Sequence, residues 1–504
     1  MSKNFDKLNK YLQKAAAYTS VLNLIDYDSN VNAPADSDMY TSKVTGIISN
    51  DYHDIFTDKG FNTLLDKCKK DAEKGKLTAV EKSLVKEAVK KSRELAAIPA
   101  SEYREFSELT AKSVNIWTRA KRSASFSEFA PQLKKIVDYK KKFAEYIKTD
   151  EKCNYDVLLA SFEPEFMSDR LDDIFAQIKS AVIPLVKTAV NNQKKDETDY
   201  SFTVMKSKND IEQLKCFCDY LAGYLGFNKR RGIIGESAHP FTINMHNHDV
   251  RITNNFEAKD MLDPIFSVIH ETGHALYEQG IADVFTLTVC GEGTSMGMHE
   301  GQSRFFENMI GKRKSFWEPV YPRLEEAMPD KLSNVSLDVF MDAVNRVNPG
   351  PIRTVSDELT YPLHIIIRYE LEKKLISGTI DVEELPDEWN KRYKKYLGIT
   401  PSDDAEGVLQ DIHWAAGEFG YFPSYLIGSA VAAQIYYHIE SIMPVDRYLK
   451  EGNIAEIRSY LTENIYRYGK SIGTEKLLKK MTGNGFDVSY YIRYLTEKWG
   501  KTNE

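Results

Sequence analysis

The segment Pro264–Gly280, PIFSVIHETGHALYEQG, is the part of the chain from which the rest of the sequence can be interpreted. It contains His270-Glu271-x-x-His274. In an α-helix these two histidines lie one turn apart on the same face, where a single tetrahedral zinc ion can bind both. We therefore predict a metal-binding helix in this segment.

The residues around the motif favour a helix of this length. Asp263 suits the N-cap, Pro264 suits the first helical position, and Gly280 can end the helix in the left-handed conformation. At 100° per residue, an apolar face lies opposite the two histidines, so that we expect this face in the core and the histidines in a cleft. Its members are Ile265, Val268, Ile269, Thr272, Ala275 and Leu276.

A catalytic zinc ion normally has three protein ligands and one water, so a third ligand is needed. Glu278 lies one turn beyond His274, but three ligands in a line along one helix do not make a compact tetrahedron. Glu300, 26 residues after His274 on a following helical pattern, is the better candidate. His299 and Asp283 stay open as alternatives.

This set of residues suits amide hydrolysis. Zinc held by His270, His274 and Glu300 lowers the pKa of a bound water toward neutrality and polarises a carbonyl. Glu271, which is not needed as a ligand, can then accept a proton and later pass it to the leaving amine. A non-haem iron site ranks far below this interpretation, because Glu271 has no comparable task in oxygen chemistry.

The composition excludes some classes of partner. The chain has 504 residues, 28% of them charged, and a formal net charge of −7, so electrostatics give no reason to expect nucleic acid or an anionic membrane. Five cysteines form no CxxC pair, which favours a reducing compartment. Because no apolar signal segment or membrane-length run stands out, we expect a cytoplasmic protein without a membrane span.

Helical patterns dominate the chain. We expect a single catalytic domain, 1–504, with a helical N-terminal part at about 1–230 and a helical C-terminal part at about 431–504. The hairpin, the metal helices and the other motifs fall between them, at about 231–430. No internal repeat or long linker divides these parts.

A short β-hairpin is predicted immediately before the metal helix. Apolar and polar residues alternate from Phe241 to Thr253, and the chain can turn near Asn247-His248. On this alternation, His246 and Arg251 belong to the polar face. Six of the ten histidines lie between residues 239 and 299, which adds to the expectation of a chemical site.

Ordered motifs along most of the chain resemble the carboxypeptidase Taq family of metal-dependent carboxypeptidases. Besides His270–His274, the motifs comprise His239-Pro240-Phe241; Asp249, Arg251 and Thr253; His299-Glu300-Gly301-Gln302; Ile352, Arg353, Ser356 and Asp357; and Gly407, Gln410, Asp411, His413 and Trp414.

The resemblance implies a fold and an activity. The fold would be mainly α, a large helical saddle or clam-like metallopeptidase with a small antiparallel sheet beside the HExxH helix. The activity would be removal of single C-terminal residues from peptides with broad specificity, by one zinc ion per chain, with cobalt or another divalent metal also possible. It further implies a homodimer and Glu300 as the third ligand.

An enzyme of this kind must bind the free carboxylate of its peptide substrate, and a guanidinium is the natural partner. Arg353 is the first candidate and Arg251 the second, although each alone could be a structural salt bridge. His239, His413 and Tyr421 are candidates for contacts to the peptide backbone or to the oxyanion.

Two other functions are alternatives to a metal-dependent carboxypeptidase. A zinc oligopeptidase or dipeptidyl-type peptidase of a related HExxH class would share the metal site but needs no carboxylate clamp. A non-catalytic helical binding protein is less favoured, because all four residues of the hydrolytic site are present.

Overall fold

The protein is mainly helical, as predicted. The computed structural model describes residues 2–193, 198–257 and 259–500. The chain forms two compact units: Met1–Ala96, Asp199–Val344 and Ile435–Phe486 make the first, and Ala97–Thr198, Asn345–Gln434 and Asp487–Glu504 make the second.

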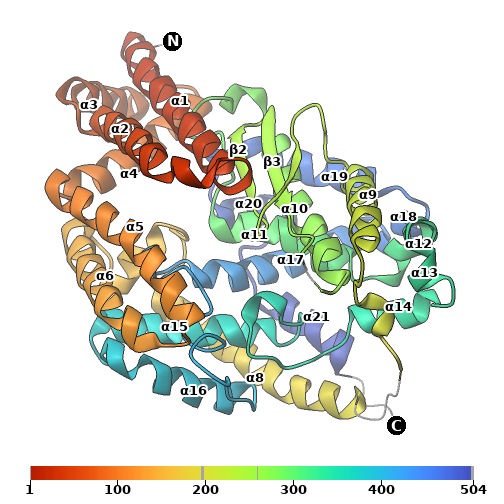
Figure 1. Ribbon diagram of the computed structural model, residues 1–504. Helices are drawn as coiled ribbons and strands as arrows, with labels where there is room; N and C mark the ends of the chain where they lie inside the picture. The colour runs from red at the N-terminus through yellow and green to blue at the C-terminus, as the bar shows by residue number, and fades with distance from the viewer. Residues whose placement is uncertain (1, 194–197, 258, 501–504) are drawn as a thin grey trace. The chain divides into compact units, whose positions relative to one another are not determined.

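The first unit contains the predicted metal helix and the only strands of the described chain (Figure 1). Its helices are α1 (Lys3–Val31), α2 (Asp38–Thr57), α3 (Lys59–Glu73), α4 (Ala79–Ala97), α9 (Lys208–Leu225), α10 (Leu262–Gln279), α11 (Met296–Arg304), α12 (Lys314–Ala327), α13 (Pro329–Leu332), α14 (Leu337–Val344), α18 (Val445–Lys450), α19 (Ile454–Asn464) and α20 (Thr474–Thr482).

The second unit is helical in its described residues. Its helices are α5 (Ala100–Arg122), α6 (Phe126–Ile147), α7 (Asn154–Ala160), α8 (Ser168–Gln193), α15 (Tyr361–Ser377), α16 (Leu385–Tyr396) and α21 (Ser489–Trp499), and α17 (Phe422–Ile442) begins here and ends in the first unit.

The metal helix forms with the expected buried face but with different ends. All six residues of the predicted apolar face of α10 are at most 4% exposed. The N-cap is Met261 rather than Asp263, and the side chain of Asp260 accepts the hydrogen bond from the backbone N–H of Leu262. Gly280 has φ −84°, so it is not left-handed. A Cβ there would lie 2.8 Å from the ring of Tyr466, and this close packing explains the glycine.

The sheet has three strands in the order β1-β3-β2, with β1 (Ile234–Glu236), β2 (Thr242–His246) and β3 (Asp249–Asn254). The predicted hairpin is confirmed: β2 and β3 are antiparallel and turn at residues 247–248. β1 pairs with β3 in parallel, so the sheet is mixed. A strand of three residues is too short to show an alternating pattern, which is why the sequence did not reveal it.

The two faces of the hairpin differ from the prediction. Thr242 lies opposite Ile252 and Ile243 opposite Arg251, and residues directly opposite each other point to the same face. Arg251 therefore shares a face with Ile243. Thr242 points to α10, where its hydroxyl meets Glu271, because the buried carboxylates of α10 require donors from the sheet. In Figure 1 the hairpin lies between α1 and α10.

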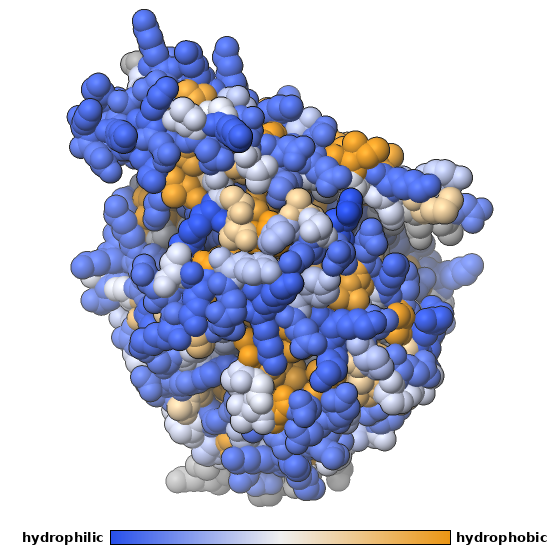
Figure 2. All heavy atoms as spheres, turned by 90° about the vertical axis from the view of Figure 1, so that its left-hand side faces the viewer, coloured by the Kyte–Doolittle hydropathy of each residue, from blue (hydrophilic) through white to orange (hydrophobic). Residues whose placement is uncertain are grey.

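The surface is mostly polar. Figure 2 shows a predominantly hydrophilic face on which apolar side chains form separate patches. Exposed apolar residues of α2 include Tyr40, Val44 and Ile47. None of the described helices combines the length and the apolar character that crossing a membrane requires.

Candidate metal centre

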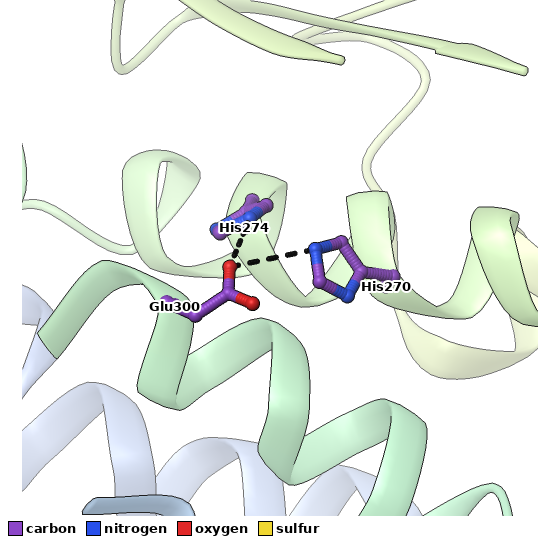
Figure 3. A group of neighbouring side chains, drawn as sticks. All are labelled: His270, His274 and Glu300. Carbon is purple, nitrogen blue, oxygen red and sulfur yellow. Dashed lines mark ion pairs between the residues drawn. The ribbon is translucent and has the colours of Figure 1, made fainter. Parts of the chain in front are cut away.

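His270, His274 and Glu300 meet between α10 and α11 (Figure 3). Oε2 of Glu300 lies 3.5 Å from Nε2 of His270 and 3.4 Å from Nε2 of His274. One ligand atom from each residue lies within 4.8 Å of the other two. The three predicted ligands therefore converge on one point.

The position of Glu300 depends on a close contact between the two helices. A Cβ on Gly273, inside the HExxH motif, would lie 2.7 Å from Cα of Ser303 and 2.8 Å from the carbonyl oxygen of Gln302. Only a residue without a side chain permits this approach. The absence of a side chain at Gly273 lets α11 bring Glu300 within reach of both imidazoles.

These distances suit a divalent cation. A tetrahedral zinc ion with bonds of about 2.0–2.1 Å holds its ligand atoms about 3.3 Å apart, close to both histidine–glutamate separations. Two imidazole nitrogens and one carboxylate oxygen are a donor set that zinc accepts, with one position left for water or substrate. The residues present thus fit a catalytic metal.

Glu307 and Arg304 contact two of the predicted ligands, His270 and Glu300. Nδ1 of His270 lies 2.7 Å from Oε2 of Glu307, and a histidine that donates to a carboxylate through Nδ1 can bind a metal through Nε2. Arg304 donates from Nε to Glu300 at 2.7 Å and from Nη1 to Glu307 at 3.0 Å. Glu307 lies in a π-helical turn, Phe305–Ile310, that continues α11.

Burial and neighbouring charges shift the pKa values of all three residues. Burial disfavours the charged imidazole of His270, but the carboxylates of Glu300 and Glu307 outweigh burial and raise its pKa to about 10. Burial lowers the pKa of His274 to about 3, and the charge of His299 adds to this effect. Burial opposes ionisation of Glu300, yet His270 and Arg304 lower its pKa well below the ordinary value.

Glu271 faces the sheet side of α10. It is 7% exposed, and Oε2 accepts a hydrogen bond of 2.6 Å from the hydroxyl of Thr242 on β2. Burial raises the pKa of Glu271, while His270 and the Thr242 hydroxyl oppose this rise. The carboxylate is thus made more basic than an exposed one and is held by one oxygen.

The other candidates for the third ligand are engaged elsewhere. Nε2 of His299 lies 2.8 Å from Oε1 of Glu278, so these two residues pair with each other. Asp283 is exposed and pairs with His248 at 2.8 Å. The two alternatives that the sequence left open, His299 and Asp283, therefore have other partners, and Glu300 is the carboxylate beside both imidazoles.

Known proteins resemble this chain over nearly its whole length. The sequence model of the carboxypeptidase Taq (M32) metallopeptidases matches residues 7–499. The chain belongs to this family. Carboxypeptidase 1 of Bacillus subtilis (strain 168) is 39% identical over 97% of this chain and 96% of that protein. Thermostable carboxypeptidase 1 of Pyrococcus furiosus is 34% identical, with 94% of each chain covered.

Solved structures agree with the family assignment. The crystal structure of the M32 carboxypeptidase from Deinococcus radiodurans R1 matches with a TM-score of 0.93 at 29% identity, and 99% of each chain is covered. The structure of Pyrococcus furiosus carboxypeptidase matches with a TM-score of 0.93 at 33% identity, again over 99% of each chain. As a member of the M32 family, the protein is a metal-dependent carboxypeptidase.

Two of the predicted substrate-binding residues, Arg251 and His239, lie in the first unit. Arg251 on β3 makes a bidentate pair with Asp249, with both N–O distances 2.9 Å, and its guanidinium lies 5.0 Å from the ring centroid of Tyr27. His239 is exposed in the segment between β1 and β2. Arg251 therefore already has a carboxylate partner, and His239 is accessible.

The other three predicted substrate-binding residues, Arg353, His413 and Tyr421, lie in the second unit. Arg353 is 7% exposed and donates to Oδ1 of Asp411 from Nε at 2.9 Å and from Nη2 at 2.8 Å. Oδ2 of Asp411 accepts from Nε of Arg368 at 2.6 Å. One carboxylate thus faces two guanidinium groups, which leaves this cluster with an excess of positive charge.

His413 and Tyr421 form an aromatic group next to each other. Their ring centroids are 5.5 Å apart, and Nε2 of His413 lies 3.1 Å from the hydroxyl of Tyr425. Burial lowers the pKa of His413 to about 3, with Asp411 opposing and Arg353 adding to the effect. His413 is therefore neutral at physiological pH.

Several residues that contact the predicted site residues were not predicted from the sequence. Glu307 follows Glu300 by two helical turns, and Arg304 follows it by one, so their spacing gave a weak signal. The sequence contains no signal for Thr242 beyond its place in an alternating strand. Arg368 directly follows the apolar run Ile365–Ile367 of α15. A charged residue in a buried helix is unusual, and this was the only signal in the sequence for its role.

Proposed function

We propose that one divalent ion per chain, zinc or alternatively cobalt, is held by His270, His274 and Glu300 in this carboxypeptidase. The supporting observation is that one carboxylate oxygen of Glu300 lies 3.5 Å and 3.4 Å from the two Nε2 atoms, close to the separation of two ligands of a tetrahedral zinc ion. When bound, such an ion supplies a Lewis acid for the scissile carbonyl and makes water more acidic.

Glu271 is the proposed general base. Thr242 holds Oε2, which leaves Oε1 for the proton, and burial makes the carboxylate more basic. Glu271 accepts a proton from the attacking water and donates it to the departing amine nitrogen, so the C–N bond breaks with release of a single C-terminal residue.

The free C-terminal carboxylate of the peptide is proposed to bind Arg353. A buried guanidinium whose cluster has excess positive charge supports this role, since a carboxylate would balance that charge. Arg251 is the second candidate. His239, His413 and Tyr421 are proposed to contact the peptide backbone or the oxyanion, and the neutral His413 suits a hydrogen bond better than an ion pair.

Domain organisation, assembly and location concern the whole chain. We propose one catalytic domain, 1–504, because the family match extends over both units. A homodimer and a cytoplasmic location are proposed from the resemblance and from the composition, which has no regular cysteine framework.

A paired-substrate assay tests the activity. A mixed pool of free-acid peptides and their C-terminally amidated twins is incubated with the enzyme, and products are identified by mass spectrometry with and without a chelator. Free-acid peptides should lose one residue at a time, and chelation should stop the reaction. Equal cleavage of the amidated twins would contradict the proposal and favour an endopeptidase, while release of dipeptides would favour a dipeptidyl-type enzyme.

A further inference from the structure

The two imidazoles of the proposed metal centre are held in different ways. Nδ1 of His270 has a carboxylate partner, Glu307, at 2.7 Å, as is usual for a metal-ligating histidine. Nδ1 of His274 is buried and has no hydrogen-bond partner among the residues that the structure describes. Hydrogen bonding therefore orients the ring of His270 but not that of His274.

A second ring lies against His274. The imidazoles of His274 and His299 have centroids 4.4 Å apart and planes 26° apart, a stacked arrangement. Tyr277 continues the row at 5.5 Å from His299, and Tyr466 follows at 5.1 Å from Tyr277. Four rings thus lead from the metal ligand into the core. Because protein interiors are densely packed, a ring at the end of such a row has little freedom to turn.

His299 is itself fixed by Glu278, which is 3% exposed. Oε1 of Glu278 lies 2.8 Å from Nε2 of His299 and accepts from the backbone N–H of Gly293 at 3.0 Å. Oε2 accepts from the side-chain amide of Asn244 on β2. A Cβ on Gly293 would lie 2.7 Å from Cδ2 of His299, so this side of the ring has no free space. The sheet, the loop before α11 and α11 itself thus all restrain His299.

We infer that His299 is a positioning residue for His274, and that its ring takes the place of the missing hydrogen bond at Nδ1. Glu278 acts through His299 by holding the ring in plane. This inference rests on the proposed function, because it requires His274 to be a metal ligand. It assigns a task to two residues that the family motif and the HExxH spacing left without one.

Substitutions at position 299 separate the ring from the rest of the side chain. His299→Phe keeps a flat ring against His274 but gives up the hydrogen bond to Glu278, whereas His299→Leu removes the ring. We expect His299→Phe to bind Zn²⁺ within about threefold of the unsubstituted protein, and His299→Leu about 10- to 100-fold more weakly, as for other lost outer contacts of metal ligands. His299→Asn, polar but without an aromatic ring, should behave as His299→Leu does.

Affinity is measured by competition with a chromophoric chelator, and the Co²⁺-loaded protein provides a second readout. Its visible absorption reports ligand geometry, so the spectrum should change in His299→Leu and stay the same in His299→Phe. His248→Leu is the matched control, because it also removes an imidazole that is paired with a carboxylate in the same unit. Nε2 of His248 lies 2.8 Å from Oδ1 of Asp283. This control should leave both readouts unchanged.

Two results would overturn the inference: unchanged affinity in His299→Leu, or equal losses in His299→Phe and His299→Leu. If His299→Leu does not fold, His299→Asn against His299→Phe makes the same comparison. His270→Ala tests the metal site separately. Unchanged Zn²⁺ affinity in His270→Ala would refute the proposed site, whereas lost binding there with no effect at position 299 would refute the positioning role alone.

Discussion

Gly273→Ala should separate the two metal-binding helices. The new Cβ would lie 2.7 Å from Cα of Ser303, which is 0.7 Å short of the 3.4 Å where ordinary contact begins. The atoms that it meets are backbone, so a side-chain rotation cannot relieve the clash. The helices must therefore move apart by several tenths of an ångström, whereas metal–ligand distances tolerate only about 0.2 Å.

The expected consequences are weaker metal binding and a less stable fold. We expect the affinity for Zn²⁺ to fall at least about tenfold, and overpacking to cost about 1–3 kcal/mol of folding free energy. Chelator competition measures the first quantity and chemical denaturation of the metal-free protein the second. Gly223→Ala is the control, because Gly223 lies within α9 and a Cβ there meets no atom within 4 Å.

The control should keep the Zn²⁺ affinity of the unsubstituted protein and lose no stability, since alanine is the better helix former. Unchanged affinity in Gly273→Ala would show that the position of Glu300 does not depend on the close approach of α11. A loss of affinity in Gly223→Ala as large as that in Gly273→Ala would contradict this dependence as well.

Four further predictions concern proton transfer, the outer contacts of the metal, substrate binding and pH. Glu271→Gln should keep stoichiometric zinc by elemental analysis yet lower kcat about 10²- to 10⁴-fold, and near-normal turnover would remove Glu271 as general base. Glu307→Gln should weaken Zn²⁺ binding about 10- to 100-fold in a chelator titration, and unchanged affinity would contradict its role at the imidazole. Arg353→Ala should lower kcat/KM for free-acid peptides more than Arg251→Ala does. If Arg353→Ala lowers kcat/KM for free-acid and amidated peptides equally, the substrate carboxylate binds at another residue. The pKa of His413 is lowered from 6.5 to about 3, so its contribution to stability is complete above pH 6.5 and is lost as the pH falls toward 3. His413→Gln should therefore flatten the decline of Tm over that range, and an unchanged decline would argue against a neutral, buried His413.

The metal helix could be predicted from sequence because its signals are local. HExxH and the apolar face opposite it are both set by the helical period, and the structure confirms the buried face. Its ends could not be predicted, because Gly280 is explained by a ring, Tyr466, that is distant in sequence. Asp260 rather than Asp263 meets the first turn, and composition alone does not distinguish these two neighbours.

The contacts around the proposed metal site could not be predicted from sequence, because they depend on the tertiary structure. The sequence favoured Glu300 as the third ligand but left His299 and Asp283 open. In the fold, His299 pairs with Glu278 and Glu300 lies beside both imidazoles, which are tertiary contacts that spacing alone does not determine. The pairing of Arg353 with Asp411, 58 residues apart, likewise has no local signal, although both residues belong to motifs that the sequence singled out.

One divalent ion is proposed to bind between α10 and α11. Anomalous diffraction at the zinc edge, from crystals of the Zn²⁺-loaded protein, would locate this ion. One strong peak per chain is expected, at about 2.0–2.2 Å from Nε2 of His270, Nε2 of His274 and a carboxylate oxygen of Glu300. A peak at any other set of residues, or a peak that contacts both histidines while Glu300 points away, would contradict the proposed site.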